Sequence, residues 1–131
     1  MILLLDTNIC IHAIKREAAV LSRLAERSPD DFGITAVTLA ELWFGAAKSS
    51  RPQRTRASVE AFLKPFETLP FGREAAEDYA KIRLQLETAG QPIGERDLII
   101  AAIARSLRLT VVTRNVREFS RVQGLRVEDW L

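Results

Sequence analysis

Short, almost wholly apolar runs alternate along the chain with longer stretches in which apolar residues recur at helical spacing. The runs are typical of buried strands, and the longer stretches of helices that pack on a sheet. Strands are expected at residues 2–5, 32–35, 66–69, 109–112 and 125–127, and helices at 9–14, 18–27, 39–47, 52–64, 73–89, from 95 or 97 onward, and at 116–120. The alternation predicts a single α/β domain over residues 1–131, with helices on both sides of a mostly parallel sheet in a three-layer α/β/α arrangement.

Local signals indicate where several of these helices begin and end. Thr38 is expected to cap the helix that carries Glu41, and Gly90 is expected to end the long helix at residues 73–89. The helix that starts at Glu95 or Asp97 is apolar nearly all round, so we expect it to lie centrally against the sheet.

The composition is typical of a protein from a reducing compartment. With 131 residues, the chain is long enough to bury about two thirds of its unfolded surface. Cys10 is the only cysteine, so no intramolecular disulfide forms, as is usual in the cytosol. The apolar run 2–5 is too short for a signal-peptide core or a membrane span. We therefore expect a soluble cytoplasmic protein with no membrane partner.

Arginine dominates the basic residues, since only four of the 19 are lysines. The arginines gather within residues 51–56 and 105–121, and guanidinium groups suit phosphate recognition. Binding to a polyanion is one interpretation. The other is that these arginines lie on solvated helix faces and pair with the 17 acids, and the charge pattern alone slightly favours it.

Three carboxylates stand in apolar surroundings. Asp6 closes the first apolar run, Glu41 lies within the segment 37–44, and Asp97 precedes the run 98–104. Buried carboxylates without partners are costly, and several close together raise one another's pKa. A hard divalent cation bound by their oxygens would compensate, and a cation open to solvent activates water. If the fold brings the three together, they form a metal site.

The strand order offers one place where these acids can meet, because ligands of open parallel sheets bind beyond the carboxyl ends of the strands. Asp6 and the segment 113–115 each follow a strand, and Asp97 and Glu41 lie in the first turns of helices that can face the same edge. A structural interpretation is also open: Asp6 as a helix cap and Asp97 as an acid that offsets the helix dipole. Glu41 is harder to explain in this way, because its neighbours are apolar.

Other chemistries lack the residues that they need. His12 is the only histidine, which excludes a zinc site built on several histidines and leaves a serine hydrolase a single candidate base. The six glycines are dispersed, so neither a glycine-rich phosphate loop nor a nucleotide cofactor is indicated.

Four motifs, taken in order, resemble those of the PIN-domain family. They are Leu4-Leu5-Asp6-Thr7-Asn8, then Ala40-Glu41-Leu42, then Ile93-Gly94 with Asp97-Leu98-Ile99-Ile100-Ala101-Ala102, and finally Val112-Thr113-Arg114-Asn115 with Phe119. More narrowly, the chain resembles the VapC toxins of type II toxin-antitoxin pairs, in their FitB-like branch. The resemblance runs from residue 1 to about residue 130.

The resemblance implies a parallel sheet of five strands and an endoribonuclease that uses Mg²⁺ or Mn²⁺ to cut structured or single-stranded RNA, such as tRNA or rRNA. Asp6, Glu41 and Asp97 would be the catalytic, metal-binding acids, and Asn115 would complete the pocket. Many relatives carry a further acid where this chain has Asn115, and Glu118 is a nearby substitute.

Neighbouring polar groups have supporting roles in this interpretation. Thr7, Asn8 and Thr113 would hydrogen-bond the metal ligands, because outer partners commonly orient such ligands. Arg114 would hold the RNA backbone. The resemblance further implies a homodimer and a cognate VapB-type antitoxin, which forms a hetero-oligomer with the toxin, masks the pocket and binds operator DNA through its own domain.

Two other functions remain open at this point. A catalytically weak PIN-like module that binds RNA or protein would also explain the missing late acid and the arginine groups. A phosphoryl-transfer or receiver-like domain shares the strand-end aspartate. It predicts a second acid beside Asp6 and a lysine after a late strand, where the chain has Thr7 and Arg114.

Overall fold

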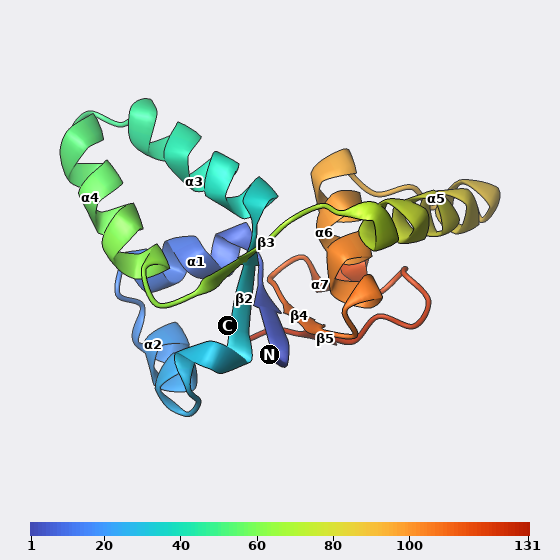
Figure 1. Cartoon of the computed structure of the whole chain (residues 1–131), viewed down its shortest axis with the longest axis horizontal. Coiled ribbons are helices and arrows are strands. Elements are labelled where there is room, and N and C mark those ends of the chain that lie inside the picture. Colours follow the sequence, from blue (N-terminus) through green and yellow to red (C-terminus); the bar gives the residue numbers. More distant parts are fainter.

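A computed structural model describes all 131 residues and has a five-stranded sheet at its centre (Figure 1). The strands are β1 (Leu3–Leu5), β2 (Phe32–Thr35), β3 (Glu67–Leu69), β4 (Thr110–Val112) and β5 (Val127–Glu128). Their order is β3-β2-β1-β4-β5, and all four pairings are parallel. The expected five-stranded sheet is confirmed, and it is parallel throughout.

Seven α-helices cover the two faces of this sheet. They are α1 (Thr7–Ile14), α2 (Ala18–Ala25), α3 (Ala36–Ala47), α4 (Pro52–Leu63), α5 (Arg73–Thr88), α6 (Glu95–Ser106) and α7 (Val116–Phe119). Helices α1 to α4 pack on one side and α5 to α7 on the other (Figure 1). The predicted three-layer α/β/α arrangement is confirmed.

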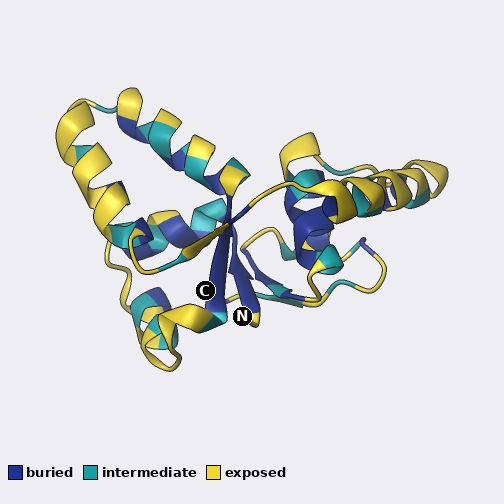
Figure 2. Cartoon of the chain, viewed as in Figure 1, coloured by how far each residue is buried: buried dark blue, intermediate teal, exposed yellow.

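The central strand β1 contributes to both hydrophobic cores. Because successive side chains of a strand point to opposite faces, Leu3 and Leu5 pack with α1 to α4, while Leu4 packs with α5 to α7. All three leucines are buried, and the strands at the middle of the sheet are dark blue in Figure 2. The apolar run therefore fixes the position of Asp6, the residue that follows it.

Helix α6 has the central place that its composition predicts. Leu98 and the segment 100–104 are buried, and the helix packs between α5 and the sheet (Figure 2). This packing fixes the first turn of α6, which carries Asp97, relative to the sheet.

Helix α3 begins earlier than expected, and the assignment of Thr38 as its cap is wrong. Thr35, the last residue of β2, is the N-cap: its backbone is extended and its hydroxyl accepts a 3.2 Å hydrogen bond from the amide of Thr38. The strand therefore passes directly into the helix, and Thr38 lies in the first turn, fully buried.

Other boundaries differ by one or two residues. Helix α1 begins at Thr7 rather than at residue 9, because Asp6 caps it, and β5 lies one to two residues later than the expected strand 125–127. Gly90 follows α5 with a φ of 70°, the left-handed conformation that confirms it as a helix stop.

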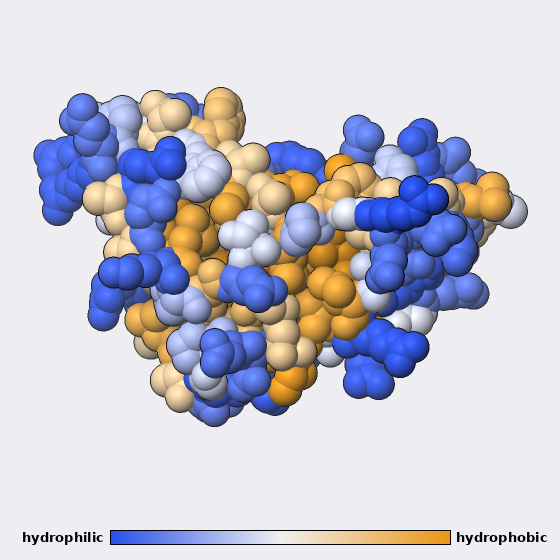
Figure 3. Space-filling view, viewed as in Figure 1, coloured by the Kyte–Doolittle hydropathy of each residue, from blue (hydrophilic) through white to orange (hydrophobic).

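The surface is strongly polar at its two ends. In the view of Figure 3, hydrophilic side chains cover the outer ends over α4 and α5, and apolar side chains make up much of the surface between them. None of the helices combines the length and apolarity needed to cross a bilayer.

Candidate functional site

The carboxyl edge of the sheet brings two sequence-predicted residues into direct contact. Asp6 follows β1 and Thr113 follows β4, and these strands are neighbours. The hydroxyl of Thr113 donates a 2.7 Å hydrogen bond to Oδ2 of Asp6, although 107 residues separate the two. Both side chains are buried, so the bond lies out of bulk water.

Asp6 is held at both of its oxygens. The amide of Thr7 donates to Oδ1 at 2.8 Å, and the side-chain amide of Asn8 lies 3.4 Å from Oδ2. Burial raises the pKa of Asp6, and the charge of Glu41 adds to the shift, whereas the hydrogen bonds from Thr113 and Thr7 oppose it. Asp6 is thus a capping residue, as the structural interpretation holds, and it also lies close enough to Glu41 to feel its charge.

Asn8 and Asn115 join the loop after β4 to this cluster. Oδ1 of Asn8 accepts the backbone amide of Arg114 at 3.2 Å, and the amide of Asn115 donates to the hydroxyl of Thr113 at 2.9 Å. The side-chain amide of Asn115 lies 3.4 Å from Oδ2 of Asp97. The loop therefore connects Asp97 to the strand edge.

Asp97 lies half-buried in the first turn of α6. Burial and, next, the charge of Asp6 raise its pKa to about 6, with smaller contributions from Glu41 and Glu118, while Asn115 lowers it. Carboxylates influence one another in this way only at short range. The structure therefore brings Asp6, Glu41 and Asp97 to one region, with Glu118 beside them.

Glu41 has two partners from different elements. Its Oε1 accepts a 2.6 Å hydrogen bond from the hydroxyl of Thr7, and its Oε2 forms an ion pair with Arg96 of α6. The Glu41 side chain is 22% exposed, whereas that of Arg96 is 73% exposed. Glu41 thus faces the site and does not extend into solvent alone.

A series of hydrogen-bonded threonine hydroxyls ends at the carboxylate of Glu41. The hydroxyls of Thr7 and Thr38 are 3.0 Å apart, and that of Thr35 lies 3.4 Å from Thr38. Since the hydroxyl proton of Thr7 is given to Glu41, Thr38 must donate to Thr7 and Thr35 to Thr38. This direction holds the carboxylate as an acceptor.

Sequence reasoning missed the roles of Arg96 and of Thr38 at this site. Thr38 precedes Glu41 by three positions on one helix, a spacing that places both on one face and that offered a usable signal. Arg96 gave no such signal, because 55 residues separate it from Glu41. Arg114 contributes only its backbone amide, and its side chain is exposed.

The donor atoms fit a hard divalent cation, although the acids do not converge in this structure. No three His, Cys, Asp or Glu side chains are arranged closely enough to hold a metal ion, and Arg96 supplies a positive charge to Glu41 instead. The candidate donors are all carboxylate oxygens, which Mg²⁺ and Mn²⁺ prefer. Burial and, after it, the charges of the neighbouring acids raise the pKa of Asp97, and a bound cation would favour its ionised form.

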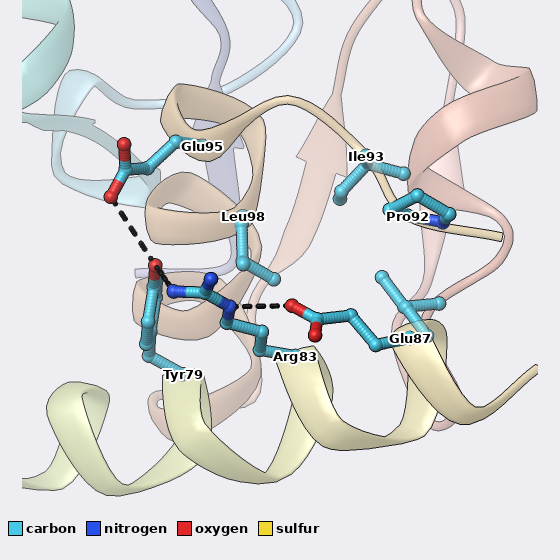
Figure 4. A pocket seen from close by; sticks show the side chains of 8 residues that line it. Tyr79, Arg83, Glu87, Pro92, Ile93, Glu95 and Leu98 are labelled. Atoms are coloured by element: carbon cyan, nitrogen blue, oxygen red, sulfur yellow. Dashed lines mark hydrogen bonds and ion pairs between the residues drawn. The ribbon is translucent and has the colours of Figure 1, made fainter. Parts of the chain in front are cut away.

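A separate cavity of about 260 Å³ lies between α5 and the start of α6 (Figure 4). Its polar groups satisfy one another: Arg83 pairs with Glu87 at 2.6 Å, and the hydroxyl of Tyr79 lies 3.4 Å from Glu95. Asp97 does not line this cavity. This cavity is therefore separate from the acidic site.

Comparison with known proteins gives a consistent picture. Residues 3–125 match the family model described as PIN domain. The chain is 43% identical to the tRNA(fMet)-specific endonuclease VapC of Shigella flexneri, over 97% of this chain and 96% of that protein. It is 39% identical to the ribonuclease VapC2 of Haemophilus influenzae strain KW20, over 98% and 97% of the two chains.

Solved structures show the same likeness. In the DNA-bound VapBC complex of Salmonella typhimurium, the matching chain has a TM-score of 0.95 and 40% identity, with 100% of this chain and 99% of that chain covered. A chain of the FitAcB complex of Neisseria gonorrhoeae has a TM-score of 0.86 and 31% identity, with 98% of each chain covered.

Proposed function

The chain belongs to the PIN-domain family and to its VapC group, and on this basis we propose that it is a metal-dependent endoribonuclease that acts as the toxin of a toxin-antitoxin pair. One observation in the structure carries the proposal. Asp6 and Asp97 are far apart in the sequence, yet the charge of Asp6 is, after burial, the largest cause that raises the pKa of Asp97 to about 6. A fold that needed these acids only as helix caps would not place them together.

Mg²⁺ or Mn²⁺ is the proposed cofactor, with Asp6, Glu41 and Asp97 as its ligands. When bound, such an ion lowers the pKa of a water molecule and neutralises charge on the phosphate under attack. Oε2 of Glu41 is paired with Arg96, so an ion that binds this oxygen would compete with the guanidinium.

The other residues of the site keep these acids in place. Thr113, Asn8 and the amide of Thr7 hold the two oxygens of Asp6, and Asn115 donates to Asp97. Outer partners of this kind commonly orient metal ligands. The charge of Glu118 makes a small contribution to the raised pKa of Asp97.

The proposed substrate is a folded RNA with an accessible single strand, and a tRNA is the leading candidate. Relatives named as tRNA(fMet)-specific endonucleases are 43% and 41% identical to this chain over nearly its full length. The exposed side chain of Arg114, in the loop beside the acids, is suited to the backbone phosphates of such an RNA.

The proposed protein partner is a VapB-type antitoxin. Similar chains from Salmonella typhimurium and Rickettsia felis were solved as DNA-bound VapBC complexes. We infer that this chain forms a homodimer and joins an antitoxin that masks the acids, and that operator DNA is contacted by the antitoxin.

Cleavage of a labelled tRNA tests the nuclease. The purified chain should cut it with Mg²⁺ or Mn²⁺ and lose activity in EDTA, in Asp6→Asn and in Asp97→Asn. The control Asp30→Asn removes the same charge from an exposed turn and should cleave normally. Full activity in both site variants would refute the proposal.

The second candidate is a PIN-like module that binds RNA or protein without cutting. The ion pair between Arg96 and Glu41, together with the lack of a converged acid cluster, favours it. Titration calorimetry with Mg²⁺ and Mn²⁺ separates the two candidates. Binding that is lost in Glu41→Gln supports the nuclease, and absence of binding to the intact protein supports the module.

A further inference from the structure

A small cavity at the opposite edge of the sheet gathers three arginines. It has a volume of about 260 Å³ and is lined by Arg105, Arg108, Leu109, Gly124 and Arg126. These residues come from the end of α6, from the segment before β4 and from the segment before β5. The cavity therefore faces away from the acids, which lie at the carboxyl edge.

The three guanidinium groups are not equivalent. Arg105 is fully engaged: it forms a two-pronged pair with Asp78, at 3.1 and 3.2 Å, and donates to the carbonyl of Gln123 at 3.1 Å. The side chains of Arg108 and Arg126 are exposed and have neither a hydrogen-bond nor an ion-pair partner. With Asp78 already paired, the cavity carries two uncompensated positive charges.

Arg108 also occupies a backbone position that disfavours it. Its φ is 58°, its amide donates to the carbonyl of Arg105, and the amide of Leu109 donates to that of Ala104. This pattern is the Schellman end of α6, where glycine is the usual residue at the left-handed position. The chain does use glycine at the same place after α5, where Gly90 has a φ of 70°.

Arg16 shows that the backbone alone does not explain Arg108. It holds the equivalent position after α1, with a φ of 62°, but it lines a cavity that has no other charged residue. Arg108 differs from Arg16 because two further arginines, Arg105 and Arg126, line the same cavity. Converging guanidinium groups of this kind recognise phosphate oxygens.

We propose that Arg108 and Arg126, with Arg105 behind them, form a phosphate-binding site that holds the backbone of the RNA substrate at a distance from the acids. This inference rests on the proposed function for the identity of the RNA. Strand β4 connects the two places: Leu109 lines the cavity, and Thr113 contacts Asp6. Four residues of strand span about 13 Å, the length of about four stacked nucleotides, so only an RNA longer than this reaches both places.

Binding of RNA in a cleavage-deficient background tests the site. With Asp97→Asn present throughout, a labelled tRNA should bind about five- to tenfold more weakly after Arg108→Gly or Arg126→Gln. Each change should also lower the slope of log affinity against log salt by about 0.7 to 0.9, the loss of one phosphate contact.

Arg16→Gly is the matched control. It removes the same charge from the same backbone conformation, and it should leave tRNA affinity nearly unchanged. Equal effects of Arg16→Gly and Arg108→Gly would overturn the proposal, because net charge would then explain both. The binding test does not depend on cleavage. If the protein with Asp97 intact binds tRNA at this site but never cuts it, the proposed nuclease is refuted and the proposed binding site is not.

A titration with inorganic phosphate, followed by NMR of the backbone amides, distinguishes the possible ligands. Shifts at Leu109 and Gly124 that vanish in Arg108→Gly, together with weakened tRNA binding, support the proposal. Phosphate shifts without an effect on tRNA would assign the cavity to a free phosphate compound and overturn it. Loss of antitoxin binding with tRNA binding intact would assign the cavity to a protein partner, and this result would also overturn it.

Discussion

Thr7 connects two acids of the site by itself: its amide donates to Asp6 at 2.8 Å, and its hydroxyl donates to Glu41 at 2.6 Å. The two acids belong to different parts of the chain, Asp6 directly after β1 and Glu41 in α3. Their separation is therefore set by the first residue of α1. A buried hydroxyl, that of Thr38, fixes the direction of the bond to Glu41.

Thr7→Val should weaken Mg²⁺ binding by about tenfold, because it preserves the shape of the side chain and removes the hydroxyl that orients Glu41. Thr7→Ser should restore most of the affinity. Titration calorimetry measures both, with the exposed Thr88→Val as the control. Unchanged affinity in Thr7→Val would show that Thr7 does not position Glu41.

Arg96→Gln should strengthen Mg²⁺ binding by about threefold or more, because it removes the ion pair that competes with the metal for Glu41. An exposed ion pair contributes about 0.7 kcal/mol, and this free energy corresponds to about threefold in affinity. The exposed Arg54→Gln, whose side chain has no ion-pair partner, is the control for net charge. Weaker binding in Arg96→Gln, measured by the same calorimetry, would mean that Arg96 supports the metal site and does not compete with it.

The metal-free protein should lose stability as the pH rises through the range from about 4 to about 6. The pKa of Asp97 is about 6 in the folded state against 3.8 as its ordinary value, so the folded protein binds more protons in this window. Above about pH 6 the carboxylate of Asp97 is charged in the folded and in the unfolded protein. Burial and the neighbouring acids then make the charged form less stable in the folded protein, which lowers the free energy of unfolding. Asp97→Asn removes this penalty.

Urea denaturation in EDTA measures the effect. At pH 7.5, Asp97→Asn should be more stable than the parent by on the order of 1 kcal/mol, a value reduced for the half-exposed position of the carboxylate. At pH 4 the two proteins should differ much less. A variant that is less stable at pH 7.5 would contradict the repulsion among the acids.

Arg108→Gly should stabilise the protein by up to about 1 kcal/mol, because glycine adopts the left-handed conformation without steric cost. Arg16→Gly should do the same at the end of α1. Thermal unfolding should show a rise in Tm of about 3 °C for each. A large fall in Tm for Arg108→Gly would mean that its side chain has a structural role.

The types of the elements could be predicted from the sequence, because each depends on the local spacing of apolar residues. The first turn of α3 could not, since Thr35 and Thr38 are both good capping residues. The choice between them depends on where β2 stops pairing with β1 and β3.

The sequence nominates the candidate residues of the site, but it does not give their geometry. Asp6, Glu41 and Asp97 attract attention because of their apolar flanks, and the family resemblance assigned them a common role. The order β3-β2-β1-β4-β5, which makes Asp6 a neighbour of Thr113, is a property of the whole chain. The pairing of Glu41 with Arg96 depends in turn on how α3 and α6 approach each other.

The place of β1 between β2 and β4 has a consequence during translation. The ribosome makes Asp6 almost first, but the strand that completes its surroundings, and the hydroxyl of Thr113, come near the end of the chain. A nascent chain lacks one wall of the site until more than four fifths of it has been synthesised. The candidate site therefore cannot take its complete form until β4 and Thr113 have been synthesised.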